Sequence, residues 1–174
     1  MATNWASAAS MVISIAVAAL SGCGPAKPAG QGRPTPSGLP VPRYVSIKFD
    51  EVNARGGPGD DYRLLWVYRA KGLPVQVVGE ADDWRQICDS TGAKAWVKST
   101  GIDGRRTVAR LDPAPLPLRA GPAPAAKVEA VLAGRTTADL DRQRSGWARL
   151  KARGGAGWAP ASAVWGLDER PQCR

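Results

Sequence analysis

The stretch Val52-Asn53-Ala54-Arg55-Gly56-Gly57-Pro58 decides the fold, because its pattern returns as Leu116-Pro117-Leu118-Arg119-Ala120-Gly121-Pro122. In both stretches an arginine follows an apolar residue by three positions, and a glycine–proline pair closes the motif. Two further landmarks return in the same order: Trp84-Arg85-Gln86-Ile87 as Trp147-Ala148-Arg149-Leu150, and Gly92-Ala93-Lys94-Ala95-Trp96 as Gly154-Gly155-Ala156-Gly157-Trp158. Such self-similarity predicts two copies of one structural unit. We place them at 43–106 and 107–167, followed by a tail over 168–174.

Each unit has the pattern of an all-β fold. Apolar and polar residues alternate from Tyr44 to Phe49, and short runs over 73–78, 84–88 and 94–98 are separated by turn residues. This is typical of an antiparallel meander with hairpin turns. Twenty glycines and fifteen prolines also favour turns over long helices. A unit of about 60 residues with these properties is best closed into a small barrel, which removes exposed strand edges.

The motif Asn53-x-Arg55-x-Gly57-Pro58, followed by Trp84 and the Trp96-Val97 strand, resembles the bacterial SH3 domain family. The whole of 41–167 resembles a tandem version found in periplasmic proteins of proteobacteria. The resemblance implies two tandem small SH3-like barrels that bind rather than catalyse. Ala95, Lys98 and Pro117 depart from the family pattern, which leaves the fold intact but puts any family ligand pocket in doubt.

The pairs Gly57-Pro58 and Gly121-Pro122 suit tight turns, in which the glycine accepts a positive φ and the proline fixes the next φ near −65°. Arg55 and Arg119 are placed to hydrogen-bond loop carbonyls. We therefore favour a role for this motif in folding the long first loop of each unit over a role in binding.

The N-terminal segment has the features of a targeting signal. The apolar run from Ala8 to Leu20 is shorter than the roughly 20 residues that span a bilayer, and it has the length of a signal-peptide core. Leu20-Ser21-Gly22-Cys23 resembles a bacterial lipobox, which implies a signal peptide over 1–22, lipidation of Cys23 and, with Gly24 next, the outer membrane. Two alternatives stay open. Ordinary signal peptidase would cleave after Ala18 or Ala19 and give a soluble periplasmic or secreted protein, or the segment would remain uncleaved with Cys23 as a plain thiol. No Lys or Arg precedes the apolar run, which weakens both signal interpretations.

Residues 23–42 form a Pro/Gly-rich tether that cannot bury a core. With Cys23 lipidated, Cys88 and Cys173 remain as a pair in an oxidising compartment. A disulfide between them and two free thiols are both open.

Aromatic residues and acids in the first unit suggest a peptide-binding groove. Tyr62, Trp66 and Trp84 would supply aromatic platforms. Asp60 and Asp61, with Asp82 and Asp83 in the next turn, would form an acidic rim suited to an amine-bearing peptide such as a peptidoglycan stem. Trp147 is the second unit's counterpart of Trp84. Both have strand parity opposite to Ile87 and Leu150, so they face outward if the latter face the core. We expect Trp96 and Trp158 to lie in the barrel cores.

Composition excludes several classes of site. The chain has no histidine, which removes Ser-His-Asp and Cys-His machineries and nearly every catalytic zinc site. We find no phosphate-binding loop and no metal-ligand spacing, and therefore predict no catalytic residues, metal or cofactor. The net charge of +9, with bases clustered at Arg142, Arg144, Arg149, Lys151 and Arg153, favours anionic envelope polymers as further partners. An exported chain would rarely meet nucleic acid.

We therefore expect a non-catalytic envelope protein that binds peptidoglycan or wall-associated peptides or proteins and contacts the membrane through its lipid anchor. The alternative is an adaptor that recruits a separate enzyme and has no affinity for glycan. Binding to purified sacculi separates the two.

Overall fold

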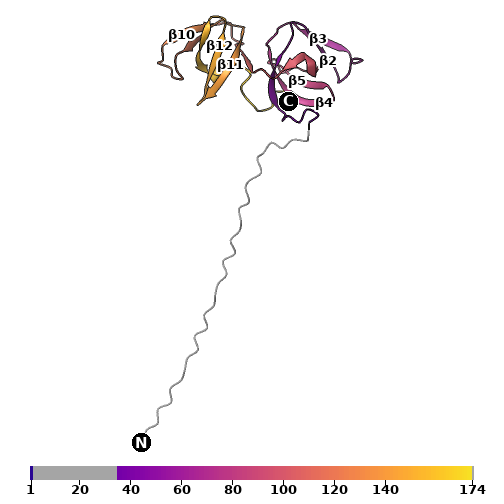
Figure 1. The fold of residues 1–174 in the computed structure, drawn as a ribbon, viewed down its shortest axis with the longest axis horizontal. Helices are drawn as coiled ribbons and strands as arrows, with labels where there is room; N and C mark the ends of the chain where they lie inside the picture. The colour runs from indigo at the N-terminus through magenta and orange to yellow at the C-terminus, as the bar shows by residue number, and fades with distance from the viewer. Residues whose placement is uncertain (2–34, 174) are drawn as a thin grey trace.

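The computed structural model describes residue 1 and residues 35–173 (Figure 1). The predicted signal peptide, the lipidation site Cys23 and most of the tether lie outside the described residues. Within the described part, no helix is long and apolar enough to cross a bilayer.

The described chain forms two antiparallel sheets (Figure 1). The strands of the first sheet are β1 (Arg43–Ile47), β2 (Val52–Arg55), β3 (Leu64–Tyr68), β4 (Pro74–Ala81), β5 (Trp84–Cys88), β6 (Lys94–Lys98) and β7 (Ile102–Asp103). Those of the second are β8 (Thr107–Ala109), β9 (Leu116–Arg119), β10 (Val128–Leu132), β11 (Thr137–Arg144), β12 (Trp147–Ala152) and β13 (Gly155–Pro160). A single 3₁₀ turn follows the main meander of each sheet, η1 (Ser99–Gly101) and η2 (Ala161–Ala163).

The two sheets are copies of one topology. The strand order is β3-β2-β6-β5-β4-β1-β7 in the first and β10-β9-β13-β12-β11-β8 in the second. With β7 set aside, the orders correspond strand by strand, so the repeat in the sequence is also a repeat in structure. A bulge interrupts β4 between Val77 and Gly79, and another interrupts β11 between Leu140 and Arg142. The predicted all-β fold with two tandem units is confirmed.

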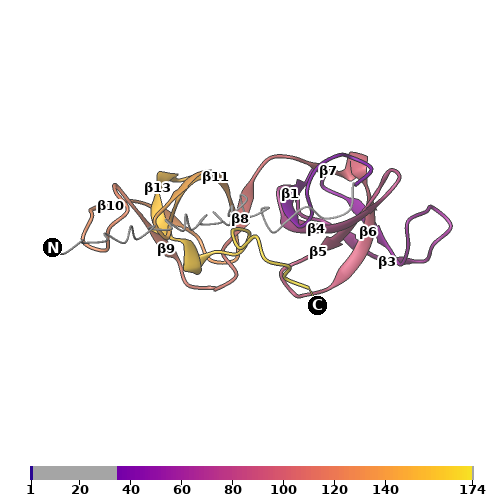
Figure 2. The same cartoon turned by 90° about the horizontal axis from the view of Figure 1, so that it is seen from below.

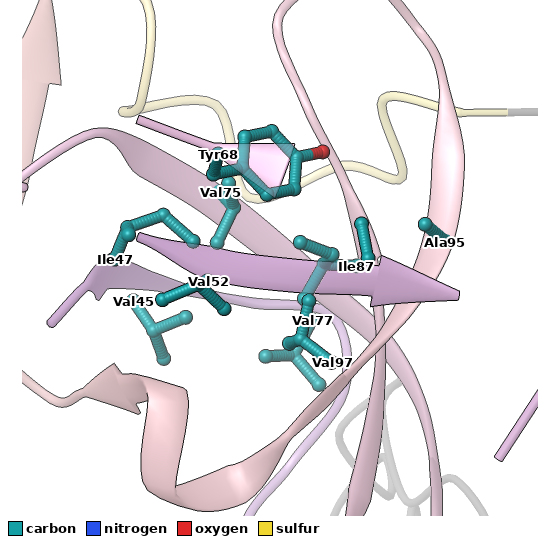
Figure 3. Packing of buried hydrophobic residues seen from close by; sticks show 10 residues of the cluster. Val45, Ile47, Val52, Tyr68, Val75, Val77, Ile87, Ala95 and Val97 are labelled. Atoms are coloured by element: carbon teal, nitrogen blue, oxygen red, sulfur yellow. The ribbon is translucent and has the colours of Figure 1, made fainter. Parts of the chain in front are cut away.

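Each sheet wraps around its own hydrophobic core. Six neighbouring strands, from β3 at one edge of the first sheet to β1, contribute buried side chains to one cluster, so the sheet must curl into a barrel (Figure 3). The members are Val45, Ile47, Val52, Ala54, Tyr68, Val75, Val77, Ile87, Ala95 and Val97. Full burial of one such aliphatic side chain stabilises the fold by about 1.5–3 kcal/mol.

The core of the second barrel is built from smaller side chains. Its members are Val108, Leu116, Leu118, Ala130, Leu132, Ala138, Ala148, Leu150 and Ala159. Four of these nine residues are alanines, against two of ten in the first core. Because the hydrophobic free energy scales with buried apolar area, the second barrel draws less stability from its own core than the first does.

Trp96 and Trp158 lie outside both cores, so the expectation that they form the barrel interiors was wrong. Side chains alternate between the two faces of a strand. On β6 the inward positions belong to Ala95 and Val97, and on β13 the inward position next to Trp158 belongs to Ala159. Both tryptophans are therefore half-buried on the outer face.

A set of buried polar contacts joins the two barrels. The Thr107 hydroxyl, on the first strand of the second barrel, donates to the Gly72 carbonyl of the first barrel over 2.8 Å. The Ser46 hydroxyl of the first barrel lies 2.8 Å from the Thr107 hydroxyl and donates to the Arg105 carbonyl in the linker over 2.6 Å. Nearby, the rings of Tyr44 and Trp165 pack edge to face, with their centroids 5.2 Å apart. Buried hydrogen bonds are costly to break, so these contacts fix one barrel against the other.

The C-terminal tail returns from the second barrel to the first. In two views the C-terminus lies beside the first barrel, next to β4 and β5 in Figure 1 and next to β5 in Figure 2. Gln76, which is fully buried, donates to the Arg170 carbonyl and accepts from the Gln172 amide, each over 2.9 Å. A disulfide then joins Cys88 to Cys173, with Cα atoms 5.8 Å apart. The outward parity that Cys88 shares with Trp84 is what brings its sulfur to the tail.

Glu80 holds the start of the described chain against the first barrel. Its carboxylate has no exposed side-chain surface and lies 2.6 Å from the Arg43 guanidinium and 3.4 Å from that of Arg85. The amide and hydroxyl of Ser37 also donate to it. Burial alone would raise the pKa of the Glu80 carboxyl, but the hydrogen bonds from Ser37 and Arg43 and the charge of Arg43 lower it overall.

Candidate functional site

One end of the first barrel carries a hollow of about 230 Å³, which we call the first-barrel hollow. It combines an aromatic ring with charges of both signs. Its lining comes from the β1–β2 turn, β2, the long β2–β3 loop, the start of β5 and the segment around η1. The lining residues are Phe49, Glu51, Val52, Asn53, Arg55, Asp60, Trp84, Lys98, Thr100 and Gly101.

Strand alternation and register place the central residues of this hollow. On β2, Val52 and Ala54 face the core, which turns Asn53 and Arg55 outward. Trp84, the first residue of β5, is directly opposite Lys98 at the end of β6. The Lys98 ammonium lies 5.7 Å from the centroid of the Trp84 ring, a cation–π distance. Trp84 is 8% exposed, so it contributes part of a packed wall to the hollow.

The acidic and basic side chains of the first-barrel hollow are equal in number, and most of them form ion pairs with one another. The Asp60 carboxylate lies 2.6 Å from the Lys98 ammonium and 4.0 Å from the Arg55 guanidinium. Glu51 is a second acid in the lining and pairs with Arg69 outside it. Exposed ion pairs of this kind contribute little to stability, roughly 0–1 kcal/mol. Their value here is chemical, because the hollow offers both an anion and a cation to a ligand.

Arg55 and Arg119 close the long loops of their barrels, as the sequence predicted. The Arg55 guanidinium donates to the Tyr62 carbonyl and that of Arg119 donates to the Ala126 carbonyl, each over 2.8 Å and across seven residues. The two bonds are equivalent in the repeat. The shared motif thus folds the loop, and in the first barrel it also presents Arg55 to the hollow.

The expectation that Gly57 and Gly121 adopt a positive φ was wrong. Among the described residues the glycines with positive φ lie elsewhere, for example Gly92 and Gly146 in hairpin turns. Gly57 is required by close approach instead, because a β-carbon there would overlap the ring of Tyr62. At the equivalent Gly121 the nearest atom to such a carbon is 3.9 Å away.

The structure brings together two of the six residues proposed for ligand binding. Asp60 and Trp84 line the same hollow. Tyr62 rests on Gly57 and is 51% exposed, while Trp66 packs edge-to-face with Tyr68 and against the first core. A single platform of Tyr62, Trp66 and Trp84 is therefore not formed, because the loop and strand positions turn the three rings to different surroundings.

The other two proposed residues lie apart from this hollow. Asp61 is exposed in the β2–β3 loop and does not belong to the lining. Trp147 begins β12 of the second barrel, where it is half-buried opposite Pro160. Repeat alignment puts Pro124 where the first barrel has Asp60 and Pro160 where it has Lys98. The Asp60–Lys98 pair beside Trp84 thus has no counterpart in the second barrel.

Sequence reasoning did not single out Lys98, Phe49 or Thr100 as members of the site. The strand pairing of Trp84 with Lys98 was the available signal, because a hairpin with a known turn sets which residues face each other. Phe49 and Thr100 come from segments joined only by folding, where Gly101 lets Val52 approach closely. No local sequence pattern predicts that contact.

The described residues contain no group of three or more His, Cys, Asp or Glu side chains that could hold a metal ion. What the first-barrel hollow can do is hold a small zwitterionic or peptide-like group.

Comparison with known proteins gives the family. Residues 48–104 and 112–166 match the family described as "Bacterial SH3 domain". The chain is similar to a Bacillus subtilis (strain 168) protein with the name "Putative N-acetylmuramoyl-L-alanine amidase YrvJ", with 30% identity over 129 residues. The matched region is 68% of this chain and 24% of that relative, so the chain spans about a quarter of the relative's length.

Two solved structures from Trichomonas vaginalis, NlpC1 and NlpC2, are similar at 12% and 13% identity, each with a TM-score of 0.33. The alignments cover 72% and 71% of this chain and 46% and 48% of theirs. The family match, in contrast, spans more than half of the chain and falls on both copies of the repeat. The chain therefore belongs to the bacterial SH3 domain family and carries two successive copies of that domain.

Proposed function

We propose that this chain is a non-catalytic binding protein of the bacterial cell envelope, attached to peptidoglycan through the first-barrel hollow. The family and the similarity to a protein named as an N-acetylmuramoyl-L-alanine amidase support a role at the cell wall. The lack of histidine in the whole sequence supports a binding role rather than acyl-transfer chemistry.

The main support for this proposal is that the first-barrel hollow combines an aromatic wall with equal numbers of acidic and basic side chains. Glu51 and Asp60 offer acceptors for an amine, and Arg55 and Lys98 offer donors for a carboxylate. Peptidoglycan stem peptides carry both free carboxylates and amines on short aliphatic residues. Charge-assisted hydrogen bonds would orient such a peptide, while Trp84 and Phe49 supply apolar contact.

The proposal is tested by titrating the purified full-length protein with soluble disaccharide-peptide fragments of digested peptidoglycan, followed by tryptophan fluorescence. We expect saturable binding that Asp60→Asn and Lys98→Gln each weaken. Asp61→Asn is the matched control, because it removes a neighbouring exposed carboxylate that does not line the hollow. Equal affinity in the Asp60→Asn and Asp61→Asn variants would overturn the proposed site.

A second candidate function, an envelope adaptor that recruits a separate protein, is favoured by the edge of the second sheet. Strand β10 is at the end of the strand order and carries Val128 and Val131, which are 43% and 52% exposed. Exposed edge strands are sites where another chain adds by backbone hydrogen bonding. Failure of all peptidoglycan fragments to bind, with cross-linking of an envelope protein to a photoreactive residue at position 131, would favour this function.

The proposed place of action is the periplasmic face of the outer membrane, through a lipid on Cys23. The support is the lipobox-like Leu20-Ser21-Gly22-Cys23 at the end of an apolar run. Metabolic labelling with palmitate should mark the wild-type chain and not a Cys23→Ser variant. Export of an unlabelled chain would instead support ordinary signal cleavage.

A further inference from the structure

A second concave region lies where the two barrels meet. Two cavities of about 480 and 550 Å³ adjoin there and share Lys71, Thr137 and Arg153 in their linings. We call them together the interdomain cleft. The first barrel contributes the β3–β4 turn, and the linker contributes Arg105. The second barrel contributes residues of β8, β10, β11 and β12, together with the β10–β11 and β12–β13 turns. None of its residues lines the first-barrel hollow.

The interdomain cleft is strongly cationic. Its lining contains five bases, Lys71, Arg105, Arg135, Lys151 and Arg153, and one acid, Asp139. The first-barrel hollow, in contrast, has two bases and two acids. A cleft lined by charges of one sign concentrates field lines and attracts ions of the other sign. The two concavities therefore select for different ligands.

Three of the five bases are available to a ligand. Lys151 lies 2.9 Å from Asp141, and Arg105 lies 4.0 Å from Asp139. Among the described residues, Lys71, Arg135 and Arg153 have no carboxylate within ion-pair distance, and all three are exposed. Thr137, also exposed, adds a hydroxyl to the linings of both cavities. Guanidinium and ammonium groups with a neighbouring hydroxyl are the donors that hold phosphate and carboxylate oxygens.

A buried hydrogen bond and a disulfide hold the two walls of the interdomain cleft in place. The buried bond from Thr107 to the Gly72 carbonyl joins the two barrels at its floor, and both residues belong to the lining. The Cys88–Cys173 disulfide ties the C-terminal tail, which follows the second barrel, to the first barrel. The cationic groups are therefore gathered before a ligand arrives, which lowers the entropy lost on binding.

We infer that the interdomain cleft is a binding site for a linear polymer with repeated oxyanion groups, held mainly by Lys71, Arg135 and Arg153. The extent of the two adjoining cavities suits a segment of a chain rather than one small ion. This site goes beyond the proposed attachment to stem peptides, because it uses other residues and other chemistry. Phosphate and carboxylate groups are both suitable ligands for these donors.

The test uses the full-length oxidised protein and two fluorescently labelled probes, inorganic polyphosphate and poly-L-glutamate, with binding followed by fluorescence anisotropy in 50 mM salt. We expect at least one probe to bind, and the tighter of the two identifies phosphate or carboxylate as the preferred group. The double variant Lys71→Gln/Arg153→Gln should weaken binding about tenfold.

The matched control is Arg63→Gln/Arg144→Gln, which removes the same charge at exposed positions outside the cleft. It should weaken binding less than about threefold, since only long-range attraction is reduced. Equal losses in the two double variants, or no binding of either probe, would overturn the inference. Binding of peptidoglycan fragments by the cleft variant, measured alongside, shows whether the first-barrel hollow acts independently.

Discussion

Loss of the Cys88–Cys173 disulfide should markedly destabilise the chain. The bond joins residues 85 positions apart and closes a loop that contains the whole second sheet. In the chain-entropy treatment, closing a loop of this length in the unfolded state is worth about 4.5 kcal/mol. The effect should fall hardest on the second barrel, whose alanine-rich core supplies less hydrophobic stabilisation.

Urea unfolding followed by tryptophan fluorescence measures this effect. The variant to compare is Cys173→Ser in a Cys23→Ser background, because Cys88 is fully buried and a hydroxyl there would add its own cost. With a urea dependence of about 2 kcal/mol per molar, the unfolding midpoint should fall by about 2 M. Reduction of the Cys23→Ser protein should lower it by a similar amount. A fall of less than about 0.5 M would refute the view that the tail locks the two barrels together.

Three further perturbations test separate parts of the structure. Ile87→Ala, which empties a fully buried site in the first core, should lower the free energy of unfolding by about 2–5 kcal/mol in urea titrations, and a loss below about 1 kcal/mol would contradict the packing described. Gly57→Ala should displace the Tyr62 ring and shift amide resonances throughout the β2–β3 loop, whereas Gly121→Ala should leave its own loop unchanged. Because the folded-state pKa of Glu80 is lowered below its ordinary value of 4.5, its carboxylate stabilises the protein above that pH and this contribution is lost as the pH falls through the lowered pKa. Glu80→Gln should therefore be less stable than wild type at pH 7, and thermal unfolding at pH 7 and pH 3 should show the difference narrowing in acid.

Much of the fold could be predicted from the sequence because its determinants are local and repeated. The arginine–glycine–proline motif occurs twice, and in both copies the arginine closes its loop through the same hydrogen bond. Strand alternation also placed Cys88 on the outer face, where the tail reaches it.

The placement of two tryptophans could not be predicted correctly without the strand register. Trp96 and Trp158 were expected in the cores. The neighbouring Ala95, Val97 and Ala159 occupy the inward positions instead. The core residues next to each tryptophan on the same strand set its outward orientation.

The interdomain cleft could not be predicted, because its geometry depends on contacts between separate elements. The Thr107–Gly72 bond joins residues 35 positions apart, and the bases it gathers come from both barrels. In the sequence, Lys71 lies far from the basic cluster of the second unit. Only the folded arrangement shows that Lys71, Arg135 and Arg153 share one concavity.

Cosedimentation of the full-length protein with intact peptidoglycan sacculi in about 0.5 M salt tests the central proposal most directly. Exposed charges interact over only about 4 Å under these conditions, so general attraction by the basic surface is suppressed. We predict that the wild-type protein pellets with the sacculi and that the Asp60→Asn/Lys98→Gln variant remains in the supernatant. A wild-type protein that stays in the supernatant, or a variant that pellets as fully as wild type, would contradict peptidoglycan binding through the first-barrel hollow.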